Sequence, residues 1–185
     1  MEDATLFTQS LQVRKEADAL LEESQLLSFL QSYGIVQMAG SYSLGLMINR
    51  DIDVYVINPA HTQDSTLEAL HASIRRNCFQ LHLYYNSFQF PREGMPPGYY
   101  IGIKTPFRGH KWKVDIWFLH ADLLTRSQLI QMVEQAHETE KGAILRFKHL
   151  VLEKKLDISS VLIYEAVLQK HITNEQTFLA FLAQH

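Results

Sequence analysis

The chain has 185 residues, of which 46% are hydrophobic and 20% are charged. These are ordinary values for a folded globular protein, and they exclude a disordered or fibrous chain. Seventeen Lys and Arg against twenty Asp and Glu give a net charge of −3, which argues against a protein that coats long nucleic acid through bulk charge. The single cysteine, Cys78, cannot form an intrachain disulfide, and no Cys/His quartet for a structural zinc ion is present.

The N-terminal segment MEDATLFTQS lacks the basic and apolar regions of a signal peptide. No apolar run approaches the roughly 20 residues that a membrane-spanning helix needs. We therefore expect a soluble, cytoplasmic protein of a reducing compartment, with no membrane partner.

Hydrophobic spacing predicts a first helix over residues 6–32, which ends at Tyr33-Gly34. Periodicity, β-branched content and the positions of Pro and Gly predict the later elements. In chain order these are strand 35–39, a helical turn over 43–47, strand 51–58, helix 65–76, strands 79–88, 99–104 and 113–119, and helices 126–138, 141–155, 159–170 and 174–183. Residues 91–98 form a proline-rich loop, and residues 105–112 form a hairpin connection.

This order of elements predicts an α+β fold with a short mixed sheet, flanking helices and a helical C-terminal part. We expect a core over residues 1–120 and a helical region over residues 121–185 that packs on it.

Two carboxylates emerge from the predicted strand 51–58. Asp51 and Asp53 are two positions apart, so both leave the same face, while Ile52 and Val54 point into a core. Carboxylates this close repel each other unless a cation lies between them or one takes up a proton. A hard divalent ion such as Mg²⁺ is the natural occupant.

Asp115 repeats this pattern in the strand 113–119, where Val114, Ile116 and Phe118 form the buried face. An acid in the middle of an apolar strand is costly unless that side carries a wet or metal-bearing site. If this strand pairs beside strand 51–58, three carboxylates converge in an arrangement that suits two metal ions bridging a phosphoryl group.

Gly40 and Ser41 stand between a strand and a short helical turn. A glycine followed by a small hydroxyl residue lets backbone N–H groups approach an anion closely, and the Ser41 hydroxyl adds a donor. These two residues are the candidate phosphate-binding element.

Taken together, Gly40-Ser41, the Asp51-x-Asp53 pair and the later Asp115 resemble the nucleotidyltransferase superfamily typified by DNA polymerase beta. Ser43 and Gly45 make the likeness greatest to its minimal and antibiotic-modifying bacterial members. The resemblance covers residues 35–119. It implies Mg²⁺ held by Asp51, Asp53 and Asp115, which are also the catalytic residues, with the β- and γ-phosphates of a nucleoside triphosphate such as ATP at Gly40 and Ser41.

The implied reaction transfers a nucleoside monophosphate to a hydroxyl acceptor and releases pyrophosphate. We expect a small-molecule acceptor rather than long nucleic acid, because the chain has no extended basic groove in sequence. Two alternatives remain open: an antitoxin of this fold that acts on a protein partner, and a catalytically silent nucleotide-binding module. A homodimer is compatible with the apolar residues of the tail.

Several basic residues have no assigned role at this stage. Arg50 precedes the acidic pair where many relatives carry a small residue, and the segment 104–113 either steers a triphosphate or is a solvated loop. Lys148 or Arg146 either contacts the phosphates or lies on the surface. The aromatic residues around the proline-rich loop either stack on a ring or fill a sheet face.

Overall fold

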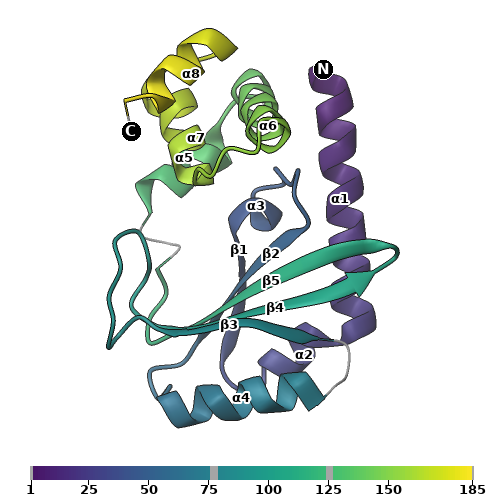
Figure 1. Ribbon diagram of the computed structural model, residues 1–185, viewed down its shortest axis with the longest axis vertical. Coiled ribbons are helices and arrows are strands. Elements are labelled where there is room, and N and C mark those ends of the chain that lie inside the picture. Colours follow the sequence, from purple (N-terminus) through teal and green to yellow (C-terminus); the bar gives the residue numbers. More distant parts are fainter. Residues whose placement is uncertain (1, 76–78, 124–126, 185) are drawn as a thin grey trace.

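The computed structural model describes residues 2–75, 79–123 and 127–184 (Figure 1). Cys78 and the predicted start of a helix at Arg126 lie outside these residues. In chain order the elements are α1 (Asp3–Ser24), α2 (Leu26–Leu30), β1 (Ile35–Ala39), α3 (Gly40–Ser43), β2 (Asp51–Ile57), α4 (Gln63–Arg75), β3 (Gln80–Asn86), β4 (Tyr99–Phe107), β5 (His110–Leu119), α5 (Gln128–Gln135), α6 (Glu138–Glu153), α7 (Ser160–Tyr164), a π-helical segment (Glu165–Gln169) and α8 (Glu175–Leu182).

The strands of the described residues form one five-stranded sheet in the order β1-β2-β5-β4-β3. Strands β2 and β5 are parallel, whereas β1 with β2, β5 with β4 and β4 with β3 are antiparallel. The sheet is therefore mixed, and the predicted α+β class with flanking helices and a helical C-terminal part is confirmed.

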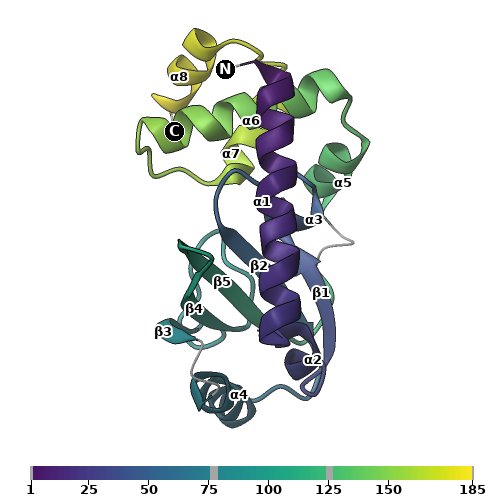
Figure 2. The ribbon, with the colours of Figure 1, turned by 90° about the vertical axis from the view of Figure 1, so that its right-hand side faces the viewer.

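One face of this sheet carries the main hydrophobic core. Alternation along β2 buries Ile52, Val54 and Val56 completely, and β5 does the same with its own alternate residues. Helices α1, α2 and α4 cover this face, and Figure 2 shows α1 running along the whole sheet region and on to the helical part. The opposite face carries the candidate carboxylates and a smaller cluster around Tyr100, Trp117 and Leu119.

A second hydrophobic cluster joins the C-terminal helices to Leu6 of α1 and to Leu46 and Ile48, which precede β2. Ser127, Ser159 and Asn174 cap α5, α7 and α8 through their side-chain oxygens, which explains where these helices begin. Helix α3 lies between the sheet and this helical part (Figure 1). The division of the chain near residue 120 stays a prediction.

The elements differ from expectation in four places. The single helix over 6–32 is broken at Gln25, whose left-handed backbone lets Leu26 and Leu30 of α2 turn into the core. The helical turn begins at Gly40, not at residue 43, because the positive φ of Gly40 bends the chain as β1 ends. Strands β4 and β5 extend to a tight turn at Arg108-Gly109, and the helix over 159–170 ends in the π-helical segment.

Across residues 2–75, 79–123 and 127–184, no helix is long and apolar enough to cross a membrane.

Candidate active site

The three candidate carboxylates lie on adjacent strands of the polar sheet face. Asp51 and Asp53 alternate with buried residues along β2, and the parallel register places Asp53 directly beside Asp115 of β5. The predicted convergence of these side chains depends on this pairing, which joins strands separated by α4, β3 and β4 in the chain.

Burial and mutual repulsion act strongly on the β2 pair. Burial, followed by the charge of Asp115, raises the pKa of Asp51 to about 6, and burial together with the charges of Asp51 and Asp115 raises the pKa of Asp53 to about 7. The Oδ1 atom of Asp51 is buried without a hydrogen-bond partner. These two side chains therefore form a strained, electronegative pair that favours a cation or a proton.

Asp115 has a different environment. Its Oδ2 accepts a hydrogen bond from the Lys113 ammonium group at 2.6 Å, and its Oδ1 accepts one from the Tyr100 hydroxyl at 2.5 Å. Burial and the neighbouring carboxylates raise the pKa of Tyr100. The Tyr100 hydroxyl therefore stays protonated and donates the hydrogen bond to Asp115. Both oxygens of the third carboxylate are thus engaged by protein groups.

Gly40 lies directly against the acidic pair. It adopts a φ of +57°, and a β-carbon at this position would lie 1.9 Å from Oδ2 of Asp53. Only glycine is compatible with this close approach, because any side chain would displace the carboxylate. The glycine of the Gly-Ser pair therefore has a steric role toward Asp53 in addition to any role toward a ligand.

Ser41 is joined to the helical part through Lys148. The Lys148 ammonium group donates to Oγ of Ser41 at 2.6 Å, to the Leu46 carbonyl at 3.0 Å and to the Tyr164 hydroxyl at 3.0 Å. Lys148 is only 7% exposed, and this burial lowers its pKa to about 8 although the charge of Asp53 opposes the shift. Burial also raises the pKa of Tyr164 to about 12.

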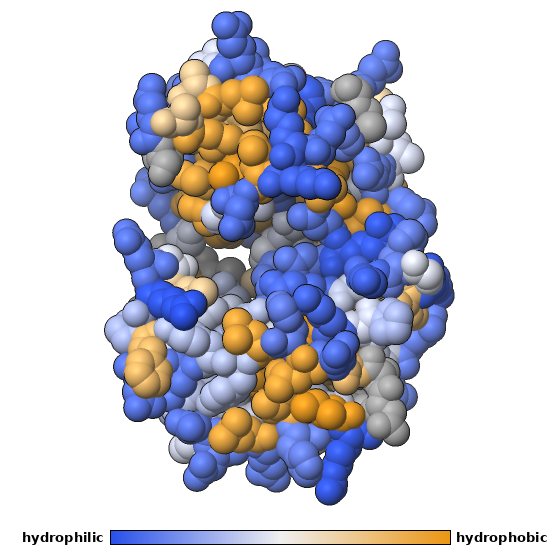
Figure 3. All heavy atoms as spheres, in the orientation of Figure 1, coloured by the Kyte–Doolittle hydropathy of each residue, from blue (hydrophilic) through white to orange (hydrophobic). Residues whose placement is uncertain are grey.

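A cleft of about 580 Å³ opens between the carboxylate-bearing face of the sheet and helix α7. The acidic pair, Gly40 and Ser41 line one side, and Ser159, Ser160 and Tyr164 from the start and end of α7 line the other. Figure 3 shows the surface hollowed at mid-height, between the helical part above and the sheet below. The cleft therefore has carboxylates next to the Gly-Ser element on one side and hydroxyl groups on the other, and Lys148 contacts it through Ser41.

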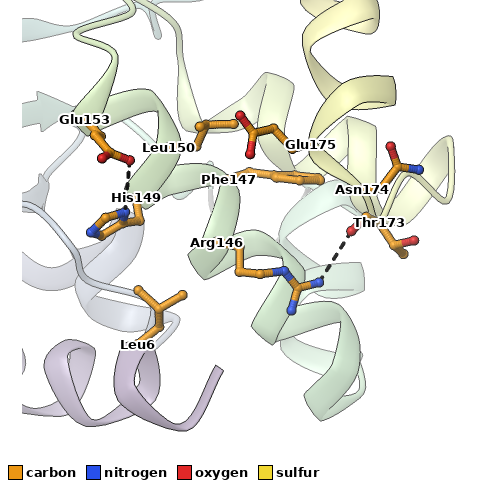
Figure 4. A pocket seen from close by; sticks show the side chains of 9 residues that line it. All are labelled: Leu6, Arg146, Phe147, His149, Leu150, Glu153, Thr173, Asn174 and Glu175. Atoms are coloured by element: carbon orange, nitrogen blue, oxygen red, sulfur yellow. Dashed lines mark hydrogen bonds and ion pairs between the residues drawn. The ribbon is translucent and has the colours of Figure 1, made fainter. Parts of the chain in front are cut away.

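Arg146 and Arg50 lie elsewhere. Arg146 is two positions from Lys148 but lines a separate pocket of about 290 Å³, where it donates to the Thr173 carbonyl (Figure 4). It also pairs with Asp3 of α1. Arg50 pairs with Glu16 at 2.9 Å. Of the two basic candidates on α6, the structure brings only Lys148 to the Gly-Ser element.

The comparisons with known proteins agree with this architecture. A scan against protein-family models finds no match, and a search of curated proteins finds none either. Among solved structures, the chain is similar to the Cid1 poly(U) polymerase, solved with Mg and 3′-dATP bound, with a TM-score of 0.57 and 19% identity over 84% of this chain and 48% of that one. It is also similar to a cytoplasmic RNA terminal U-transferase, with a TM-score of 0.58 and 19% identity over 85% of this chain and 47% of that one.

The chain has a nucleotidyltransferase-like fold. At this level of identity the similarity establishes the fold, as the sequence motifs predicted, and it is distant. The chain spans about half the length of these two solved structures.

The nucleotidyltransferase-like fold raises the question of whether the residues suit Mg²⁺. Among the described residues, no group of three or more His, Cys, Asp or Glu is arranged to hold a metal ion. Asp51 and Asp53 nonetheless suit one divalent cation, because they supply hard oxygen donors, one of which is buried and unpartnered. Asp115 suits it less, since Lys113 and Tyr100 already occupy both of its oxygens.

Sequence reasoning gave three residues of this site no place beside the carboxylates or Ser41. Lys113 was considered only as part of the basic segment 104–113, although it stands two positions before Asp115 on a strand and so shares its face. Tyr100 was interpreted only as a member of an aromatic group. Tyr164 had no signal in sequence, since its place beside Ser41 depends on how the helical part packs on the sheet.

Proposed function

We propose that this protein transfers a nucleoside monophosphate from a nucleoside triphosphate to a hydroxyl acceptor and releases pyrophosphate. The observation that carries the proposal is the cleft lined by Asp51, Asp53, Gly40 and Ser41. Asp115 pairs with Asp53 in the sheet, and Lys148 donates to Ser41. A phosphate-binding element beside a group of carboxylates suits phosphoryl chemistry better than it suits binding alone.

The triphosphate would bind at the junction of Gly40, Ser41 and Lys148. The Lys148 ammonium group donates its three hydrogens to three neutral acceptors, so a charged phosphate oxygen would replace one of them as a stronger partner. Its burial also means that the charge is poorly solvated before the ligand arrives, which favours an anion.

Asp51 and Asp53 would hold Mg²⁺, which supplies Lewis-acid stabilisation of the charge that develops on the phosphoryl oxygens. In the transfer, the acceptor hydroxyl oxygen bonds to the α-phosphorus, and the bond from that phosphorus to the α–β bridging oxygen breaks. Pyrophosphate leaves with the electron pair of that bond. The hydroxyl proton passes to a carboxylate, for which we propose Asp115, because the parallel register sets it beside Asp53.

A small-molecule acceptor fits the charges better than a long polynucleotide does. Two basic residues suited to a phosphate backbone, Arg50 and Arg108, are instead paired with Glu16 and Glu23 of α1. The net charge of −3 points the same way.

The first test is thermal unfolding with each of the four ribonucleoside triphosphates, with and without Mg²⁺. The wild-type protein should be stabilised by a triphosphate only when Mg²⁺ is present, and Asp51→Asn and Asp53→Asn should lose this stabilisation. Asp64→Asn is the matched control, because Asp64 is an exposed acid on α4, which covers the other face of the sheet.

Release of pyrophosphate is then measured with a set of hydroxyl compounds. Stabilisation without pyrophosphate release from any acceptor would favour a silent nucleotide-binding module, and release only with a co-purified protein would favour the antitoxin. Absence of any triphosphate effect would overturn the proposal.

A further inference from the structure

Lys113 lies among the three carboxylates of Asp51, Asp53 and Asp115. It faces the same side of β5 as Asp115, and the parallel register sets it next to Asp51 of β2. Its ammonium group lies 2.6 Å from Oδ2 of Asp115, and its charge lowers the pKa of both Asp51 and Asp53. One fixed cation of this chain therefore already acts on all three carboxylates.

The second oxygen of Asp115 is held by a contact that is built into β4. Tyr100 and Gly102 share a face of this strand, and Gly102 pairs directly with Asp115. A β-carbon at position 102 would lie 2.5 Å from the Tyr100 hydroxyl oxygen, so the absence of a side chain there lets the Tyr100 ring cross to Asp115. Tyr100 thus fixes Oδ1 while Lys113 fixes Oδ2.

The acidic pair of β2 presents the opposite situation. Oδ1 of Asp51 is buried and accepts no hydrogen bond, and the carboxylates of Asp51 and Asp53 lie on the same face of β2, where they repel each other. A divalent cation would relieve both features at this pair. At Asp115 it would have to lie within a few ångströms of an ammonium group, where like charges repel.

We propose that the ammonium group of Lys113 takes the place of one of the two divalent cations expected at these three carboxylates, so that the site holds a single Mg²⁺ between Asp51 and Asp53. This inference rests on the proposed nucleotidyl transfer. Lys113 then provides a permanent positive charge at Asp115, and the site needs only one metal ion.

The test counts bound Mn²⁺ by electron paramagnetic resonance, with the full chain and a non-hydrolysable α,β-methylene nucleoside triphosphate at saturation. The wild-type protein should bind one Mn²⁺ per chain, with no spin-coupled Mn²⁺ pair. Lys113→Met keeps most of the side-chain length but removes the charge, so it should bind two and show the coupled signal. Lys104→Met is the matched control, because Lys104 is exposed and pairs directly with Lys113 across β4 and β5, and it should bind one.

Each result decides a different point. Two Mn²⁺ ions in the wild-type protein would overturn the inference about Lys113 and leave the proposed function standing. One ion in both the wild-type protein and Lys113→Met would show that the ammonium group does not replace a metal. Failure of the wild-type protein to bind either the nucleotide analogue or Mn²⁺ would overturn the proposed function and this inference with it. The wild-type count requires no substitution, so it decides the question even if Lys113→Met unfolds.

Discussion

Gly40 and Asp53 are in such close contact that a β-carbon on Gly40 would lie 1.9 Å from Oδ2 of Asp53. The glycine follows β1 and begins α3, while the aspartate lies on β2, so this contact joins the candidate phosphate-binding element to the candidate metal ligands. A displacement of one of these two residues therefore displaces the other.

Gly40→Ala should therefore damage the site by more than backbone strain. A non-glycine residue in the left-handed region costs about 1–2 kcal/mol, and here the methyl group must also displace the Asp53 carboxylate. We expect at least a ten-fold loss in affinity for the Mg²⁺–nucleotide complex, measured by calorimetry. Gly94→Ala is the control, because Gly94 also has a positive φ but a β-carbon there meets nothing within 4 Å. Equal effects of the two substitutions on nucleotide affinity would contradict the steric account.

The stability of the metal-free protein should depend on Asp53. Its pKa rises from 3.8 to about 7 on folding, so the folded state binds more protons than the unfolded state between these values. The free energy of unfolding contributed by this group is then fully present below about pH 4 and is lost as the pH rises to 7. Since one pKa unit corresponds to about 1.4 kcal/mol, Asp53→Asn should stabilise the metal-free protein at pH 8 by up to about 4 kcal/mol.

Urea unfolding in the presence of a chelator, at several pH values from 5 to 8, measures this effect. His61 acts in the opposite direction, because burial lowers its pKa and stability then rises with pH. Subtracting the free energy of unfolding of Asp53→Asn from that of the wild-type protein removes the His61 contribution. Parallel pH profiles for the two proteins would show that Asp53 is not strained in the absence of metal.

Substitutions of Lys148 and of Arg146 should have different effects on nucleotide affinity. Lys148→Met removes the ammonium group beside Ser41 and should weaken nucleotide binding at least ten-fold. Because burial lowers the pKa of Lys148 to about 8, nucleotide binding by the wild-type protein should also weaken as the pH rises above 8.

Arg146→Met on the same helix breaks the partly exposed pair with Asp3, so it should cost about 0.5–1 kcal/mol of stability and leave nucleotide binding unchanged. Calorimetric titration of both variants checks this, and a loss of nucleotide affinity in Arg146→Met would mean that its pocket belongs to the site.

Substitutions of Tyr100 and Gly102 should have non-additive effects on stability. Tyr100→Phe removes the hydrogen bond to Asp115, which should cost about 1.5–3 kcal/mol because the acceptor is charged. Gly102→Ala should break the same bond by displacing the hydroxyl. The double variant should lose less stability than the sum of the two single losses, as measured by chemical unfolding of all four proteins. Additive losses would show that the two residues act separately.

Local sequence was enough to predict the parts of this site. Strand alternation placed Asp51 and Asp53 on one face and Ile52 and Val54 on the other, because the side-chain period of a strand is fixed by its backbone. The Gly-Ser pair indicated a turn at the end of a strand for a similar local reason. The α+β class followed from the order of helical and strand patterns along the chain.

The assembly of those parts depended on pairing and packing over long distances. Parallel pairing of β2 with β5 sets the register that puts Asp53 beside Asp115. Packing of α6 on the sheet brings Lys148 to Ser41, 107 positions away. Local periodicity specifies the face on which a residue lies, whereas burial of the whole apolar surface selects which faces meet. This selection brings Tyr100 to Asp115 and Lys148 to Ser41.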